Sequence, residues 1–117
     1  MRYIQSYIHN HEIGVLIELE TPYRYAMQTD EFEQLARDLA VHIAATNPLG
    51  IHKEDTVNVS PLRFKGEAPS EDNTPLLLQQ FIKDPSVTVA QKIHAVAGQL
   101  ESAIEVLRFV RFSISDM

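Results

Sequence analysis

Two segments near the N-terminus are crowded with apolar, aromatic and β-branched residues, which favours β-strands over residues 2–8 and 13–20. Between them lies a short polar run in which Asn10 tolerates the left-handed backbone of a tight turn. The pattern therefore predicts a β-hairpin. The second strand alternates as a sheet with one covered face should, its inner positions being Ile13, Val15, Ile17 and Leu19.

A helical period begins at about residue 30, after an irregular stretch around Pro22, which interrupts a strand ladder or a helix. Thr29 or Asp30 can cap this helix, and Asn47-Pro48 marks its end. Apolar residues recur at the spacing of one helix face and predict burial of that face, made of Phe32, Leu35, Ala36, Leu39, Ala40 and Ile43.

The C-terminal part predicts three further elements. Residues 76–81 favour a short extended piece, residues 86–103 a second helix, and residues 105–115 a final strand. Thr88 and Gln91 have the spacing of a capping box within the helical segment. Strands and helices of these lengths in one chain predict an α+β fold.

Residues 51–75 form the least structured stretch, because prolines and polar residues interrupt every periodic pattern there. A loop of this length is unusual in a compact domain. Leu62 and Phe64 can pin its middle to the body of the protein, and the alternative is a mobile excursion. We expect the 117 residues to form a single domain that includes this long loop.

The charge and composition narrow the class of partner. The formal net charge is -6, so a basic surface for nucleic acid or anionic membrane is not expected. No apolar run is long enough to span a bilayer, and no signal-peptide core follows Met1. The chain has no cysteine, which excludes disulfides and thiolate chemistry. We expect a cytoplasmic protein.

No constellation for catalysis or metal binding is recognisable. The five histidines lack any ligand spacing, so solvated or capping roles are favoured over a metal site. There is neither a nucleophile elbow nor a glycine-rich phosphate loop, and only four glycines occur. We therefore expect a protein that is not an enzyme and that needs no cofactor.

The connection over residues 21–27 has a composition suited to binding. It contains Tyr23, Arg24 and Tyr25 on a segment expected to be exposed. Tyrosine and arginine are favoured as interface anchors because they bring a large contact area with a polar tip. The alternative is that both tyrosines fold back onto the first helix.

Three blocks in order resemble the core, or dimerisation, domain of the elongation factor Ts family. They are the hairpin at residues 7–19, the helix from Asp30-Glu31-Phe32 to Asn47-Pro48, and residues 76–89 with the ending Arg108-Phe109-Val110-Arg111-Phe112. The resemblance implies a three-stranded antiparallel sheet packed against two main helices. It implies a divergent short member, because the family's N-terminal ubiquitin-associated-like module has no counterpart before Met1 and the helical excursion is reduced to residues 51–75.

The resemblance also implies where a partner binds. The family's Thr-Asp-Phe signature, whose phenylalanine wedges into the GTPase elongation factor Tu, aligns without gaps on Tyr23, Arg24 and Tyr25. Tyr25 then supplies the aromatic wedge, while Arg24 places a base where the family has an acid. His42 lies where the family helix approaches the GTPase, or is a structural residue at the edge of the helix's apolar face.

The function implied is that of an elongation factor Ts-like protein that binds elongation factor Tu and promotes GDP release. The alternative is a homodimeric protein-binding module on the same scaffold without exchange activity, which the altered signature favours. Short family cores pair into homodimers, and Arg108 and Arg111 on the final strand are the candidate interface residues.

Overall fold

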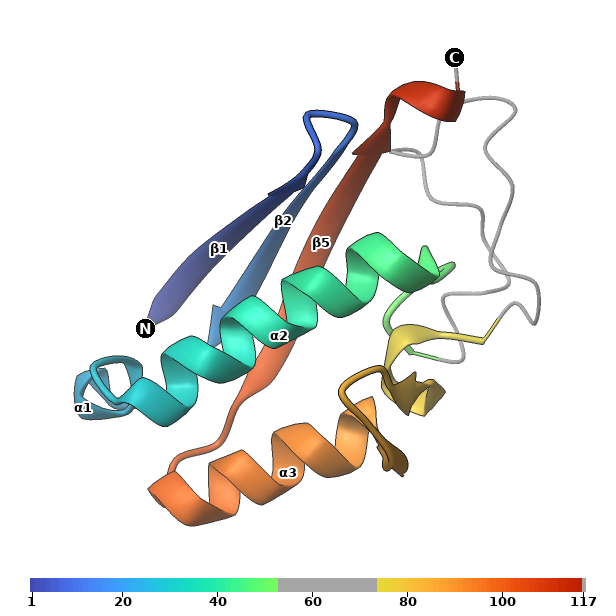
Figure 1. Ribbon diagram of the computed structural model, residues 1–117. Coiled ribbons are helices and arrows are strands. Elements are labelled where there is room, and N and C mark those ends of the chain that lie inside the picture. Colours follow the sequence, from blue (N-terminus) through green and yellow to red (C-terminus); the bar gives the residue numbers. More distant parts are fainter. Residues whose placement is uncertain (53–73, 117) are drawn as a thin grey trace.

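The fold is built on a three-stranded antiparallel sheet, which a computed structural model of the chain describes within residues 1–52 and 74–116. The strands are β1 (Arg2–His9), β2 (Ile13–Glu20) and β5 (Glu105–Ser113). Their order is β1-β2-β5, so the second strand of the hairpin is central and the C-terminal strand lies at the edge (Figure 1). The α+β class and the three-stranded antiparallel sheet are confirmed.

The N-terminal hairpin is confirmed, with its turn at the predicted position. Arg2 pairs with Glu20 at one end and His9 pairs with Ile13 at the other. Asn10 adopts a left-handed backbone with φ 52°, and His11 shares this conformation with φ 60°. Two such residues in succession match the right-handed twist of the strands they join.

Helix α2 (Asp30–Thr46) covers one face of the sheet (Figure 1). Thr29 caps its first turn by accepting a hydrogen bond from the Phe32 backbone N–H at 3.2 Å. Asn47 ends it in a left-handed conformation, with φ 49°. The predicted inner face is confirmed, because all six of its apolar residues are buried against the sheet.

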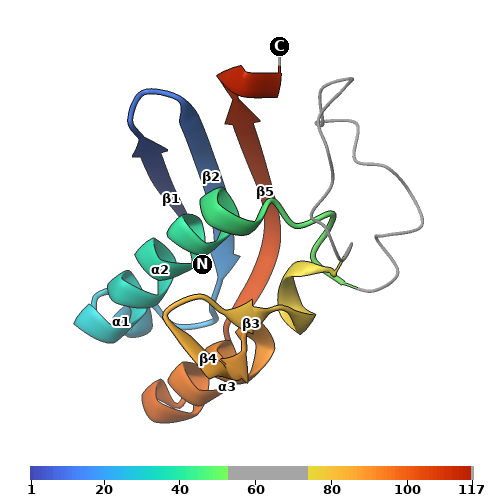
Figure 2. The ribbon, with the colours of Figure 1, turned by 45° about the vertical axis from the view of Figure 1, so that its right-hand side comes forward.

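A second helical layer lies beside α2. It consists of α3 (Val89–Leu100), the 3-10 turn η2 (Leu76–Leu78) and a small two-stranded sheet of β3 (Gln80–Phe81) and β4 (Asp84–Thr88). Figure 2 shows these elements together below α2. The chain enters this layer from α2 through Gly50 and Ile51, whose carbonyls accept hydrogen bonds from Leu76 and Leu77.

All three elements predicted in the C-terminal part differ from the structure in their bounds or type, and the helix ends at Leu100 rather than at residue 103. The helix predicted over residues 86–103 begins at Val89, because residues 84–88 pair with β3 and Thr88 is the helix cap. The capping box of Thr88 and Gln91 is confirmed. The extended piece over 76–81 is a 3-10 turn followed by a two-residue strand, and the final strand ends at Ser113 in the short turn η3 (Ile114–Asp116).

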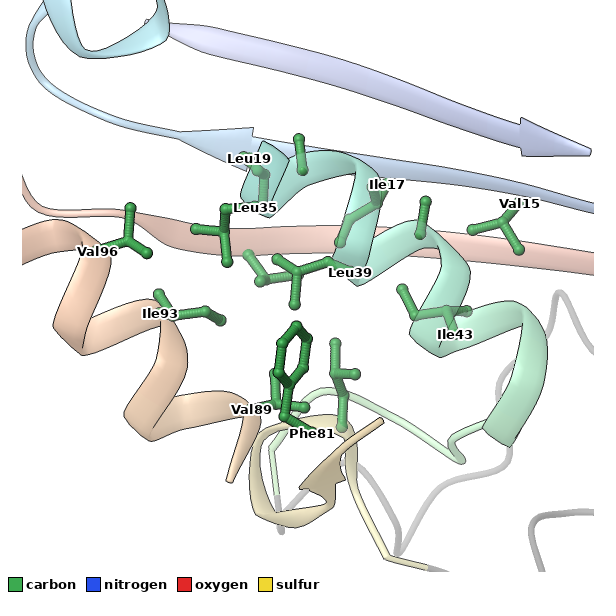
Figure 3. Packing of buried hydrophobic residues seen from close by; sticks show 14 of the residues in the cluster. Val15, Ile17, Leu19, Leu35, Leu39, Ile43, Phe81, Val89, Ile93 and Val96 are labelled. Atoms are coloured by element: carbon green, nitrogen blue, oxygen red, sulfur yellow. The ribbon is translucent and has the colours of Figure 1, made fainter. Parts of the chain in front are cut away.

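One continuous apolar core joins the sheet, α2 and the second layer (Figure 3). Val15, Ile17 and Leu19 supply its sheet side, as the alternation predicted. Phe81 reaches into the space between α2 and α3, which fastens the small sheet to the main body. Leu62, Phe64 and most of the predicted loop lie outside the described residues.

Candidate partner-binding site

The segment that follows β2 folds into a single helical turn, α1 (Arg24–Met27), within the stretch predicted to be irregular. Pro22 fixes its own backbone angle and restricts Thr21 to an extended conformation. Ala26 is fully buried, and its carbonyl accepts a hydrogen bond from the Thr29 hydroxyl at 2.7 Å. The turn is therefore fixed to the start of α2, and the residues on its outer side are presented from a rigid base.

Tyr23 and Tyr25 lie together on the outer side of this turn. Their rings stack with centroids 5.5 Å apart and planes inclined by 18°. Both rings are about half exposed, Tyr23 at 53% and Tyr25 at 49%. The alternative in which both tyrosines fold away onto the first helix is therefore wrong.

The hydroxyl of Tyr25 is held by the protein itself. It donates to the backbone carbonyl of Leu100 at 2.9 Å and lies 3.2 Å from that of Glu101. These carbonyls end α3, where helix geometry leaves backbone acceptors without a partner in the helix. The aromatic ring of Tyr25 is thus about half exposed, while its hydroxyl is bound to the end of α3.

Arg24 is the cation of the aromatic segment, which we define as residues 23–25. Its side chain is exposed and makes no hydrogen bond or ion pair with the described part of the chain. A guanidinium in this state is available to a carboxylate or phosphate on another molecule. The basic position that the sequence indicated is thus part of the accessible surface.

His42 is fully buried, so its ring does not share the accessible surface of the aromatic segment. The ring lies inside, where its Nε2 is 2.7 Å from Oε1 of Gln79 and its Nδ1 accepts from the Ile82 backbone N–H at 3.1 Å. Burial lowers the pKa of His42 below its ordinary value of 6.5, although the Gln79 contact acts in the opposite direction. Its position fits the structural alternative.

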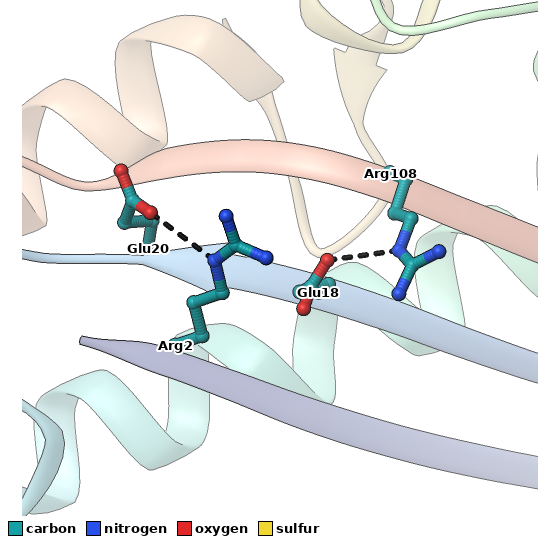
Figure 4. Close-up of polar contacts among 4 residues, drawn as sticks. All are labelled: Arg2, Glu18, Glu20 and Arg108. Carbon is teal, nitrogen blue, oxygen red and sulfur yellow. Dashed lines mark hydrogen bonds and ion pairs between the residues drawn. The ribbon is translucent and has the colours of Figure 1, made fainter.

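The two arginines assigned to one interface lie on opposite faces of β5. Arg111 points toward α2, where its guanidinium donates to the carbonyl of Ala44 at 3.1 and 3.2 Å. Arg108 is on the other face and pairs with Glu18 at 2.8 Å (Figure 4). Residues three apart on a strand must face opposite ways, so the pair cannot act as one patch.

Sequence reasoning missed the apolar character of the sheet face away from α2, which we call the open face. Its exposed apolar residues are Ile4, Ile8, Leu16 and Phe112, with Ile4 at 62% and Ile8 at 67% exposure. The ion pair of Arg108 with Glu18 lies in the same cross-strand row as Ile4, and the ion pair of Arg2 with Glu20 lies at the end of the hairpin away from its turn (Figure 4). The signal was present in β1, where Ile4 and Ile8 alternate with the inward Tyr3 and Tyr7.

Other kinds of site find little support in the described residues. Within them, no three His, Asp or Glu side chains come together as metal ligands would. None of the helices there combines the length and the apolar character that a bilayer crossing requires. The accessible features are therefore the aromatic segment and the open face.

Comparison with known proteins points to one family. The family model described as Elongation factor TS matches residues 1–62, which include the hairpin, the aromatic segment and α2. Proteins named elongation factor Ts from Solibacter usitatus and Koribacter versatilis are each 31% identical over 97% of the chain. The chain spans 65% and 63% of their respective lengths. The protein of that name from Thermodesulfovibrio yellowstonii is 32% identical over 95% of the chain, which covers 67% of it.

Proposed function

The chain belongs to the elongation factor Ts family, and on that premise we propose that it binds a GTPase of the elongation factor Tu type and promotes release of its GDP. The observation that carries the proposal is the exposed aromatic segment, which the resemblance to the family aligns with its Thr-Asp-Phe signature. Two stacked, half-exposed tyrosines and an arginine that makes no ion pair with the described residues are presented there by a turn anchored to α2 and α3.

The proposed mechanism is differential binding. A protein that contacts the nucleotide-free conformation of the GTPase better than the GDP-bound one shifts the population toward release. Guanine nucleotide and Mg²⁺ belong to the partner, and this chain contributes a rigid surface that binds it. Inserting the aromatic segment between elements of the nucleotide domain supplies the differential contact.

The remaining predicted site residues have distinct parts in this proposal. Arg24 supplies a positive charge beside the aromatic rings, and it complements an acidic group on the GTPase. His42 supports the site from inside, by joining α2 to Gln79 and Ile82 rather than by touching the partner. The partner is a cytoplasmic translation factor, so a cytoplasmic location belongs to the same proposal.

We also propose that two copies of the chain pair through the open face. An exposed apolar patch bordered by charged residues is typical of a protein interface. Ile4, Ile8 and Leu16 supply the apolar part, and Arg108 belongs to the charged part. Arg111 is excluded from this interface because it points toward α2.

The homodimer is tested by sedimentation velocity of the wild type and two variants. Ile8→Glu places a charge on the open face, whereas Leu78→Glu changes an exposed leucine of η2 with 54% exposure and serves as the matched control. We expect a dimer for the wild type and Leu78→Glu, and a monomer for Ile8→Glu. A monomeric wild type at micromolar concentration contradicts the pairing.

The exchange activity is tested by the release of fluorescent GDP from purified elongation factor Tu. We expect acceleration by the wild type and its loss when both Tyr23 and Tyr25 are replaced by alanine. Tight binding without acceleration would identify a protein-binding module on the same scaffold. The absence of any binding rejects the proposed function.

A further inference from the structure

The aromatic segment is fastened to the far end of α3 by two contacts that we call the clasp. In the first, the hydroxyls of Thr21 and Ser102 lie 2.5 Å apart and both residues are buried. In the second, the Tyr25 hydroxyl donates to Leu100, with the Glu101 carbonyl close by. Figure 1 shows α1 and the last turn of α3 at the same end of the molecule.

The clasp restricts what Tyr25 can do. A phenol has one hydrogen to donate, and here it is committed to the acceptors that end α3. Glu101 is in a left-handed conformation with φ 53°, which turns the chain and brings its carbonyl next to that of Leu100. If the Tyr25 hydroxyl inserts deeply into another protein, it must first leave the carbonyls of Leu100 and Glu101.

Tyr23 has no such restriction. Its hydroxyl makes no hydrogen bond within the described residues, and its ring is the more exposed of the two. Tyr23 follows Pro22 and has an extended backbone with φ −122°. It lies just before the helical turn α1, and the backbone next to the proline sets the direction of its side chain. In the part of the chain that the structure describes, its aromatic ring stacks on that of Tyr25.

We propose that Tyr23 is the aromatic side chain that enters the GTPase, and that Tyr25 is a positioning residue that aims it through the stack and the clasp. This inference rests on the proposed function and changes the assignment of the wedge within it. A buried tyrosine hydroxyl requires a polar partner. The cleft that receives Tyr23 therefore has apolar walls and a hydrogen-bonding group at its end.

The test measures GDP release from elongation factor Tu as a function of the concentration of this protein, which separates the maximal rate from the half-saturating concentration. Tyr23→Ala should lower the maximal rate by at least about tenfold, as expected for a central anchor. Tyr23→Phe keeps the ring and should raise the half-saturating concentration by about threefold to tenfold, through loss of one hydrogen bond.

Tyr25→Phe tests the positioning role, because it keeps the stacked ring and removes only the clasp hydroxyl. We expect the maximal rate to be nearly retained, with the half-saturating concentration raised by about threefold to tenfold. Hydrogen exchange of the amides of residues 21–27 should become faster in the free protein. Tyr7→Phe is the matched control, because it removes a tyrosine hydroxyl that contacts His9 on β1.

Each outcome decides between the two assignments. A Tyr23→Ala variant that folds, by circular dichroism, and keeps the wild-type maximal rate overturns the inference. The inference is also overturned if Tyr25→Phe strongly lowers the maximal rate of GDP release while hydrogen exchange of residues 21–27 stays unchanged. In that case the Tyr25 hydroxyl contacts the GTPase directly. If the wild type itself does not accelerate release, the proposed function fails first and the Tyr23 assignment fails with it.

Discussion

Replacing His42 is expected to have the largest effect among changes to the polar residues that join α2 to the second layer. The Ile82 backbone N–H can only donate, so Nδ1 of His42 accepts and the ring proton is on Nε2, which donates to Gln79. The neutral ring is therefore held with both nitrogens satisfied. It also stacks on Phe81, with centroids 6.0 Å apart.

His42→Ala removes both hydrogen bonds and leaves a cavity. A buried group left without its partner costs about 1–3 kcal/mol. Gln79 keeps a second contact, since its Oε1 lies 2.9 Å from the Thr46 hydroxyl, so the Ile82 N–H loses more. With the cavity included we expect a loss of about 2–5 kcal/mol in the free energy of unfolding. His42→Asn should lose less, because its Oδ1 can accept from Ile82.

The same geometry predicts a dependence on pH. Burial lowers the pKa of His42 in the folded protein below the ordinary value of 6.5, so the unfolded chain takes up the proton first. Stability is therefore fully present above about pH 6.5 and falls as the pH decreases toward the folded pKa. The slope contributed by this one histidine cannot exceed about 1.4 kcal/mol per pH unit.

Urea unfolding of the wild type, His42→Ala and His42→Asn at pH 7.5, 6.5 and 5.5 tests both expectations. His94→Ala is the control, because His94 is exposed on α3 and should leave the stability nearly unchanged. The difference in stability between the wild type and His42→Asn should shrink as the pH falls. Parallel curves for these two proteins between pH 7.5 and 5.5 would refute the buried neutral histidine.

Two further predictions concern the ends of α3. Thr88→Ala breaks the capping box with Gln91 and should cost about 1 kcal/mol in urea unfolding; a change below about 0.3 kcal/mol contradicts the cap. Thr21→Val leaves the Ser102 hydroxyl buried without its partner and should cost about 1–3 kcal/mol. Adding Ser102→Ala to Thr21→Val should cost little more, so a double-mutant cycle in which the two losses simply add contradicts their pairing.

The elements that depend on local pattern could be predicted from the sequence. The hairpin follows from alternation and a turn at Asn10, and α2 follows from a capped helical period. The capping box at Thr88 also marks the true start of α3, whereas the helix predicted from residue 86 includes three residues that belong to the end of β4. Their strand character depends on β3, a two-residue partner too short to be recognised by pattern.

The candidate site was less predictable because its contacts join distant parts of the chain. Gln79 reaches His42 from 37 residues away, so the helix pattern showed an edge position but not a buried one. The carbonyl of Leu100 reaches Tyr25 from 75 residues away, which no local motif announces. The opposite orientations of Arg108 and Arg111, by contrast, follow from strand alternation alone.

Ile8, within the proposed dimer interface, lies far enough from the aromatic segment proposed to contact the GTPase for the two to be tested separately. The aromatic segment follows Glu20, whereas Ile8 pairs with Gly14 near the hairpin turn. Glu20 lies six positions beyond Gly14 along β2, which corresponds to about 20 Å. Because of that separation, Ile8→Glu should remove pairing while each monomer keeps its aromatic segment and its rate of GDP release. If the monomeric variant also loses exchange while its fold is intact, the active surface must include residues from both copies.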